Sequence, residues 1–275
     1  MPLHMTTATL DLPFPAGQIL WGGFDLNADH DWLAIVEGES GKRLVSAATD
    51  VALAIDHPNL MLRWLGDAAL VVAPRVEEQN EINAWVVDRY TGGILNSFAV
   101  GDGVDGVAIL DDFIAVGYFD EGVFSGITPS HEGLAVFDRE GAFLWGYHSD
   151  IRGPLHIVDC YAICPSGRNH LVFCAYTKFE WVELDLAGRT QTVIATPPEL
   201  AGCKAITPVG DIAIFHAPYR RGNDKTPRED VLAFDTKTGA VTSIGALPGR
   251  VRGLSPGRLL AIGGDAVTVA TFTLD

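Results

Sequence analysis

Short hydrophobic runs recur along the whole chain. They hold four to seven residues, mostly Val, Ile, Leu, Phe and Ala, and they are separated by Gly, Pro and Asp. No long window has apolar residues at the i, i+3, i+4 and i+7 positions that mark one face of a helix. Short apolar runs between turn residues are typical of β-strands. The pattern therefore predicts an all-β protein.

A hairpin pattern repeats four times. In each copy a strand ends in Asp, a turn containing Gly follows, and a second strand begins. The Asp side chain can accept hydrogen bonds from the turn backbone, and Gly can adopt the positive φ of the turn. The spacings between successive aspartates are 50, 47 and 50 residues, and the residues are Asp88, Asp138, Asp185 and Asp235.

A second motif runs in phase with the hairpins. Turns with Pro and Gly at 165–167, 208–210 and 256–257 each precede a further strand. Repeats of about 45–50 residues with four short strands are the signature of β-propeller blades.

The repeat length sets the number of blades. Six blades share the 275 residues at about 46 each, whereas seven would leave about 39 and five about 55. The last stretch, 249–275, has room for three strands, so we predict that residues 6–12 supply the fourth. The chain is thus expected to be a single domain, 1–275. It would be a six-bladed β-propeller of four-stranded antiparallel blades, closed by an N-terminal strand joining the last blade. The other predicted blades are 17–58, 59–102, 103–151, 152–199 and 200–248.

The turns and hairpins also carry a resemblance to known proteins. The Ser-Pro-Gly turn at 255–257, the Cys-Pro-Ser-Gly turn at 164–167 and the Phe-Asp-x-x-x-Gly hairpins resemble the blades of WD-repeat and quinoprotein-like propellers. The resemblance covers most of residues 59–265. The Trp-Asp dipeptide, the tryptophan-docking repeats of quinone-dependent dehydrogenases and the Ser-x-Asp-x-Gly-x-x-Trp box of sialidases are missing from the sequence. The resemblance therefore implies a disc of blades around a central channel and no particular chemistry.

Charge excludes two classes of partner. The chain has 19 Lys and Arg against 35 Asp and Glu, a formal net charge of −16 at pH 7. Such a chain is repelled by phosphate backbones and anionic lipid surfaces, so we predict no nucleic-acid and no membrane partner.

Cysteine usage and the N-terminal residues bear on the compartment. The four cysteines lie in apolar runs without Cys-x-x-Cys spacing, which predicts free buried thiols. The first residues lack the basic and apolar regions of a secretion signal, and no run reaches the about 18 apolar residues of a membrane span. We therefore expect a cytoplasmic protein.

Loop lengths indicate where a partner binds. In a propeller the innermost strand of each blade begins at one face, the top, which also carries the loops between second and third strands. Three of these loops are long, at 74–82, 120–132 and 218–230, and the scaffold does not need their length. Charged and tyrosine side chains of this face can bind an acidic or polar ligand. Alternatively, the charged side chains form ion pairs with one another beside the channel. The candidate binding residues are Arg63, Asp105, Asp159, Tyr161, Lys204, Tyr219, Arg220, Arg221, Arg250 and Arg252.

No motif predicts catalysis. Residues 25–31 alternate oxygen ligands like a calcium loop, but His30 and Val36 replace the Gly and Glu of an EF-hand, so we expect a capped polar turn. Six-bladed lactonases and phosphotriesterases hold calcium through a Glu, an Asn and an Asp on their innermost strands. This chain offers Asp105 and Asp159 but no matching Glu. We predict no catalytic residue, no metal site and no cofactor.

Two hypotheses for function follow. The first is a non-enzymatic binding or scaffold propeller that engages a protein or peptide partner through its top face. The alternative is a small-molecule hydrolase or lactonase-like enzyme with a site in the mouth of the central channel. The long top loops and the missing catalytic motif favour the first.

Overall fold

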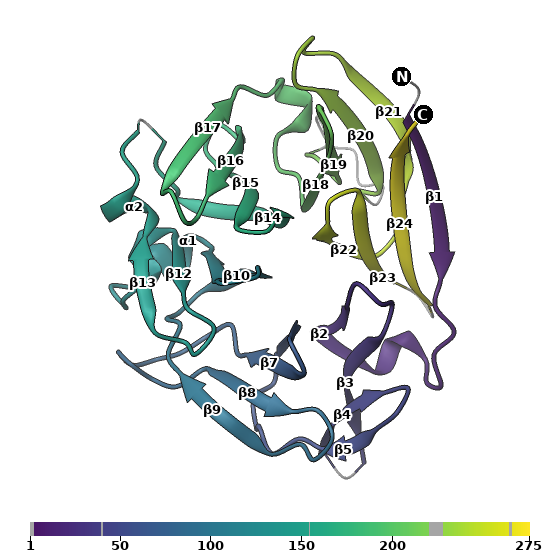
Figure 1. The fold of residues 1–275 in the computed structure, drawn as a ribbon, viewed down its shortest axis with the longest axis vertical. Coiled ribbons are helices and arrows are strands. Elements are labelled where there is room, and N and C mark those ends of the chain that lie inside the picture. Colours follow the sequence, from purple (N-terminus) through teal and green to yellow (C-terminus); the bar gives the residue numbers. More distant parts are fainter. Residues whose placement is uncertain (1–2, 40, 154, 220–227, 264–265) are drawn as a thin grey trace. The chain divides into compact units, whose positions relative to one another are not determined.

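The chain forms two compact units. The computed structural model describes residues 3–39, 41–153, 155–219, 228–263 and 266–275. The middle unit is residues 17–149, and the terminal unit combines residues 1–16 with residues 150–275. Each unit contains three four-stranded antiparallel sheets, which are the blades (Figure 1).

The middle unit holds the first three blades. β6 contacts both β2 and β10, so the first strands of neighbouring blades lie against one another. The four strands of each blade follow one another in chain order across the sheet. The strands are β2 (Ile19–Leu26), β3 (Trp32–Gly38), β4 (Gly41–Ser46), β5 (Asp50–Ala52), β6 (Met61–Leu65), β7 (Ala68–Val72), β8 (Ala84–Asp88), β9 (Ile94–Phe98), β10 (Val104–Ile109), β11 (Ile114–Tyr118), β12 (Leu134–Phe137) and β13 (Phe143–Gly146).

The terminal unit holds the other three blades. Its first strands β14, β18 and β22 contact one another, and β1 forms the outer edge of the last blade beside β24. The strands are β1 (Leu3–Thr9), β14 (Asp159–Gly167), β15 (His170–Tyr176), β16 (Trp181–Asp185), β17 (Thr190–Ile194), β18 (Ala205–Val209), β19 (Ile212–His216), β20 (Asp230–Asp235), β21 (Val241–Ala246), β22 (Arg250–Ser255), β23 (Arg258–Gly263) and β24 (Ala266–Leu274).

Helices are short and few among the described residues. They are α1 (Asp120–Val123), α2 (Tyr147–Asp150) and the 3-10 segments Ala16–Gln18, Ser130–Glu132 and Pro198–Leu200. None of the helices in the described part of the chain is long and apolar enough to cross a membrane. The six blades of four antiparallel strands confirm the predicted six-bladed β-propeller.

The N-terminal strand joins the last blade as predicted, but its limits differ. β1 runs from Leu3 to Thr9, whereas the sequence pattern indicated 6–12. Leu3 pairs with Leu274 and Thr9 with Thr268 in an unbroken antiparallel register. The strand starts earlier because Leu3 and Met5 are partly buried against the core of the last blade. This burial, and not the alternation of Thr and Leu in residues 6–12, sets the position of the strand.

The four hairpin turns are capped by their aspartates. The Asp88 carboxylate accepts from the backbone N–H groups of Tyr90 and Thr91 at 2.9 and 2.8 Å, and these bonds lower the pKa of Asp88. Asp138, Asp185 and Asp235 make the same kind of bonds. Three of the turns place a glycine at positive φ as predicted, but in the third along the chain it is Arg189, at φ 52°, that takes this conformation.

At Gly253 the first strands of the three blades of the terminal unit come close together. A Cβ atom on Gly253 would lie 2.5 Å from Cys164 Cβ on β14 and 2.6 Å from the Ile206 carbonyl oxygen on β18. We therefore expect Gly253→Ala to lower the free energy of unfolding by about 1–3 kcal/mol, as overpacking does. Urea denaturation measures it. Gly17→Ala is the control, since nothing lies within 4 Å of the position that its methyl group would take; an equal loss in both variants would contradict the explanation.

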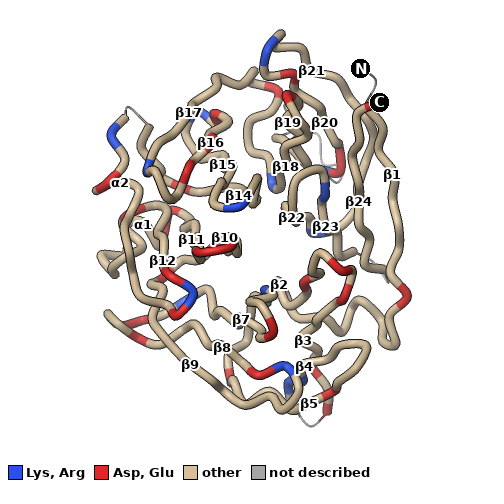
Figure 2. The backbone as a smooth tube through the Cα atoms, viewed as in Figure 1, with Lys and Arg blue, Asp and Glu red and all other residues tan. Residues whose placement is uncertain are grey.

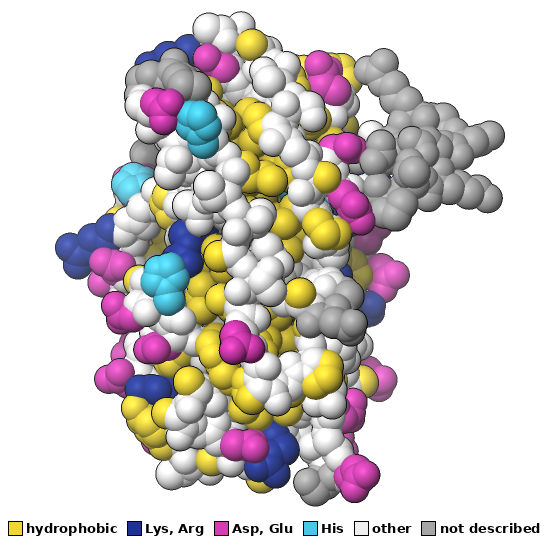
Figure 3. Space-filling view, turned by 90° about the vertical axis from the view of Figure 1, so that its right-hand side faces the viewer, with side chains coloured by type: hydrophobic (Ala, Val, Ile, Leu, Met, Phe, Trp, Pro, Cys, Tyr) yellow, Lys and Arg dark blue, Asp and Glu magenta, His cyan; other side chains and the backbone are white. Residues whose placement is uncertain are grey.

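The charged residues lie mostly outside the strands, and the cysteines lie in the interior. The strands are largely uncharged, and charged residues fall mostly in turns and loops (Figure 2). On the side shown in Figure 3, charged side chains are scattered among hydrophobic and other groups. The four cysteines are free and buried, as predicted, and burial raises the pKa of the Cys164 thiol to about 12.

Candidate functional site

The antiparallel order of the strands defines a top end for every blade. The first strand begins there, and the loop between the second and third strands returns there. In the middle unit the long loops 73–83 and 119–133 occupy this position, as predicted. In the terminal unit the loop between β19 and β20 does so, and its residues 220–227 lie outside the described residues.

Four aromatic side chains meet at the top end of the terminal unit, and we call them the aromatic cluster: Tyr161, Tyr176, Phe179 and Tyr219. The Phe179 ring packs edge to face against those of Tyr161, Tyr176 and Tyr219, with centroids 4.9, 5.7 and 5.7 Å apart. Phe179 is 4% exposed, whereas Tyr176 and Tyr219 are 42% and 46% exposed. The cluster therefore has a buried centre and an exposed rim of tyrosine rings.

The backbone fixes the central ring. Phe179 lies in the turn between β15 and β16 at φ 56°, a region that bulky residues rarely adopt. Its N–H donates to the Ala175 carbonyl at 2.9 Å, and its carbonyl accepts from the Thr196 hydroxyl at 2.7 Å. These bonds on both sides of Phe179 hold the ring beneath the tyrosines.

A backbone hydrogen bond and a cation–π contact fix the position of Tyr219. Its N–H donates to the Ala201 carbonyl at 2.7 Å, and the Arg228 guanidinium lies over its ring at 4.8 Å from the centroid. Arg228 also donates to the carbonyl oxygens of Gly202 and Ala217. A side chain at Gly202 would collide with the ring, since its Cβ would lie 2.4 Å from a Tyr219 ring carbon. Glycine at 202 is therefore required for this arrangement.

A lysine and two hydroxyls give the cluster its polar chemistry. The Lys204 ammonium lies 4.6 Å from the centroid of the Tyr161 ring, a cation–π contact. No carboxylate among the described residues lies within ion-pair distance of Lys204. The hydroxyls of Tyr161 and Tyr219 share one hydrogen bond, which uses one of their two hydrogens. The cluster thus presents an ammonium and a second hydroxyl hydrogen that can both donate.

Tyr161 stays protonated over the physiological range. Burial raises the pKa of its hydroxyl well above the usual value, and the hydrogen bond with Tyr219 and the nearby Asp159 charge raise it further. Its hydroxyl therefore acts as a neutral hydrogen-bonding group and not as a phenolate.

The structure brings three candidate residues into one site: Tyr161, Lys204 and Tyr219. Asp159 is close, because it begins β14 and pairs with Tyr176 of the aromatic cluster. Arg220 and Arg221 lie outside the described residues.

The remaining candidates lie elsewhere on first strands. Arg250 begins β22 and is exposed, and Arg252 donates to the Gly253 carbonyl at 3.0 Å. In the middle unit, Arg63 is buried and donates to the carbonyl oxygens of Val107 and Leu62, both at 2.7 Å. The bond to Val107 ties β6 to β10. Asp105 occupies a register irregularity of β10. A binding role for these four residues stays a prediction.

Sequence reasoning missed three members of the site: Tyr176, Phe179 and Arg228. The stretch from Tyr176 to Trp181 holds three aromatic residues around a turn, and this signal could have pointed to the cluster. Arg228 carries no such signal, because its partners are backbone carbonyl groups and the Tyr219 ring, which a sequence pattern does not single out.

No metal site is found in the residues that the structure describes, where no group of three or more His, Cys, Asp and Glu side chains could hold an ion. At residues 25–31 the Asn27 side chain accepts from the Asp31 N–H at 2.9 Å, which is a capped polar turn.

A buried histidine next to the site makes the stability of the fold sensitive to acid: the His216 carbonyl accepts from the Lys204 N–H at 2.8 Å. Its ring is 1% exposed; Nε2 contacts the Leu247 carbonyl at 2.8 Å, and Nδ1 has no partner. Burial lowers the pKa of His216 below its usual 6.5, and the Arg228 charge adds to this, while the Leu247 bond and Asp230 oppose it. Acidification therefore protonates the unfolded state first.

Stability is accordingly expected to fall as the pH drops below about 6.5, by up to about 1.4 kcal/mol per pH unit for this one proton. Urea denaturation between pH 7.5 and 5 measures the slope. His216→Gln keeps a donor for the Leu247 carbonyl but cannot titrate, so it should flatten the slope. An unchanged slope in that variant would show that other groups cause it.

Comparison with known proteins establishes the fold and no family. No protein-family model and no curated protein sequence matches the chain. Among solved structures, a streptogramin B lyase matches with a TM-score of 0.57 at 9% identity, covering 98% of each chain. They share a fold. The WD40 repeats of RRP9 match with a TM-score of 0.57 at 9% identity, covering 97% of each chain. A chain in a mitotic checkpoint complex matches with a TM-score of 0.58 at 13% identity, covering 92% of this chain and 77% of its own.

Proposed function

We propose that the chain is a non-enzymatic binding propeller that holds an acidic segment of a protein or peptide partner on the aromatic cluster. The observation that carries this proposal is the Lys204 ammonium, which lies on an aromatic face beside exposed tyrosines and has no acidic partner in the described residues. A carboxylate of the partner would accept from this ammonium and from the spare tyrosine hydroxyl. The exposed rings of Tyr176 and Tyr219 would cover apolar groups next to that carboxylate.

The make-up of the cluster supports a protein-binding role. Tyrosine and other aromatic residues are enriched at interfaces, and a few aromatic or basic anchors supply most of the binding energy. The edge-to-face packing around Phe179 orders the rings before a partner arrives. Pre-ordered side chains lose less entropy on binding, which favours affinity.

Fold-level analogy points the same way. A similar chain comes from a mitotic checkpoint complex, and another consists of the WD40 repeats of RRP9. The analogy concerns architecture, so the proposal rests on the cluster. We further propose that residues 1–275 act as one domain.

A peptide-display selection tests the proposal. A random peptide library is panned on the wild type, on Tyr219→Ala and Lys204→Ala, and on Lys237→Ala as the control. Lys237 is also an exposed lysine, but it lies in the turn between β20 and β21, at the opposite end of the strands, where it pairs with Asp211. The wild type and Lys237→Ala should enrich peptides rich in Asp and Glu, and the two cluster variants should not. Equal enrichment by all four proteins would refute the proposal.

The hydrolase or lactonase-like alternative stays a prediction, and no contact within the described residues favours it. Elemental analysis of the purified protein tests it. A stoichiometric divalent metal that Asp105→Ala or Asp159→Ala removes would favour the enzyme over the binding module.

A further inference from the structure

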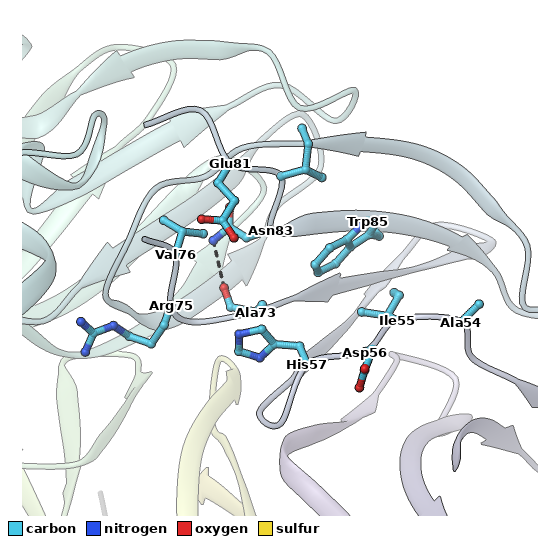
Figure 4. Close-up of a pocket in the computed structure, with 11 residues that line it drawn as sticks. Ala54, Ile55, Asp56, His57, Ala73, Arg75, Val76, Glu81, Asn83 and Trp85 are labelled. Atoms are coloured by element: carbon cyan, nitrogen blue, oxygen red, sulfur yellow. Dashed lines mark hydrogen bonds between the residues drawn. The ribbon is translucent and has the colours of Figure 1, made fainter. Parts of the chain in front are cut away.

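The middle unit contains a cavity of about 220 Å³ near the top ends of its first two blades. It lies between the segment that joins these blades, residues 53–60, and the loop and strand that include residues 73–85 (Figure 4). Cavities for drug-sized ligands measure about 300–1,000 Å³, so this one suits a single side chain or a small molecule.

One wall of the cavity is apolar. Ile55, Ala73 and Val76 line it together with the ring of Trp85. In the part of the chain that the structure describes, no cation and no aromatic ring stacks on Trp85. Tryptophan is the aromatic side chain that attracts cations most strongly. The wall therefore suits an alkyl chain that ends in a cation.

Glu81 and His57 supply acceptors in the lining of the same cavity, in addition to Asp56, which pairs with Lys42. The Glu81 Oε2 atom accepts from the N–H groups of Glu77 and Glu78 at 2.8 and 3.1 Å, and no donor from the described residues reaches Oε1. His57 Nδ1 lies 2.8 Å from the Asn59 carbonyl oxygen and 3.3 Å from the Asn59 nitrogen; because a carbonyl oxygen can only accept, the shorter contact places the hydrogen on Nδ1. His57 Nε2 is then a second acceptor.

Arg75, the cationic side chain of the cavity lining, already forms ion pairs with two carboxylates. Arg75 donates from Nε to Asp102 at 2.9 Å and from Nη1 to Glu121 at 2.5 Å. Figure 4 shows its guanidinium extending away from Trp85. The neighbouring loop adds the carboxylates of Glu77 and Glu78, so the surroundings of the cavity are negative.

We propose that this cavity binds an alkylammonium group. The ammonium donates to Glu81 Oε1 and His57 Nε2, and the methylene stem lies on Trp85 and Ile55. Such a group is supplied by a free small amine or by a lysine side chain of a protein partner. The cavity is independent of the aromatic cluster, which belongs to the other unit.

NMR titration tests the proposal on the full chain. The protein has six tryptophans, so a ¹⁵N-labelled sample gives few indole N–H signals, and Trp85→Phe identifies that of Trp85. The probe is n-butylammonium chloride, and n-butanol is the neutral control of the same length. The expected result is a saturable shift of the Trp85 signal with the amine and not with the alcohol. No saturable shift, or an equal shift with the alcohol, would overturn the proposal.

A pair of matched variants tests the role of Glu81. Glu81→Gln keeps an oxygen that can accept from the two loop N–H groups but removes the charge, so it should weaken n-butylammonium binding about tenfold or more. Glu78→Gln makes the same charge change in the same loop outside the cavity lining, and its effect should be about twofold or less. Equal losses in both variants would overturn the site and leave only a general charge effect.

A second probe distinguishes the sources of the ammonium. Nα-acetyl-lysine methylamide carries the same group on a peptide-like backbone. If it shifts the Trp85 signal as n-butylammonium does, the cavity admits a lysine of a protein partner. If n-butylammonium alone binds, the ligand is a free amine.

Discussion

A variant that begins at residue 10 is expected to lose most of the stability of the terminal unit. β1 pairs with β24 over seven residues, from Leu3 opposite Leu274 to Thr9 opposite Thr268. Its removal would expose the backbone edge of β24 and uncover the core on which Leu3 and Met5 pack. At about 0.5–1 kcal/mol for each lost hydrogen bond, plus the lost apolar burial, the cost is about 3–7 kcal/mol. This is a large part of the about 5–15 kcal/mol that stabilises a folded protein.

Urea denaturation followed by tryptophan fluorescence measures the loss. A synthetic peptide of residues 1–12, added in trans, should restore part of the stability because it can occupy the same edge. A scrambled peptide of the same composition is the control. If the shortened chain unfolds at the same urea concentration as the wild type, β1 does not close the last blade in solution.

Charge reversal at Lys204 is expected to have the largest effect on binding. For an acidic peptide obtained by selection on the wild type, Lys204→Glu should weaken binding by at least about 10–100-fold, the loss that corresponds to one charge-assisted hydrogen bond. The new carboxylate would also repel that of the peptide. Fluorescence anisotropy of the labelled peptide measures the change, and salt should weaken binding to the wild type more than to the variant.

Lys237→Glu is the matched control for this reversal. It changes the net charge by the same amount at the opposite end of the strands, in a turn where Lys237 contacts Asp211. Its effect on peptide binding should stay within about twofold. Similar losses in the two reversals would mean that only the total charge of the protein governs binding.

The architecture could be predicted from the sequence because it repeats. Asp88 and Asp235 cap equivalent turns 147 residues apart, and such spacing shows blade length without any knowledge of tertiary contacts. The residue that takes the positive φ of a turn was harder to predict, because more than one residue of the turn can adopt that conformation. At the third of these turns the positive φ falls on Arg189, although Gly188 is next to it.

The candidate site could be predicted only in part. The starts of the innermost strands placed Tyr161 and Lys204 on the top face, the long loop 218–230 placed Tyr219 there, and the structure brings the three together. Phe179 was missed because its role depends on a left-handed turn conformation, which a sequence pattern does not indicate for phenylalanine. Arg228 was missed because it bonds to backbone carbonyl groups, those of Ala217, Pro218 and Gly202, whose positions depend on how the loops fold.

The cavity of the middle unit could not be predicted at all. Trp85 and Glu81 come from one blade and His57 from the segment before it, so their meeting depends on how neighbouring blades pack. The sequence indicated only that the loop beside them is long.

Hydrogen exchange of the wild type with and without a selected acidic peptide shows whether the aromatic cluster holds the partner. We predict slower exchange in residues 176–180, 201–204 and 217–219, which carry or adjoin the aromatic cluster, and no change in the turn 236–239. Slower exchange confined to that turn, or to other parts of the chain away from the aromatic cluster, would contradict the proposed binding site.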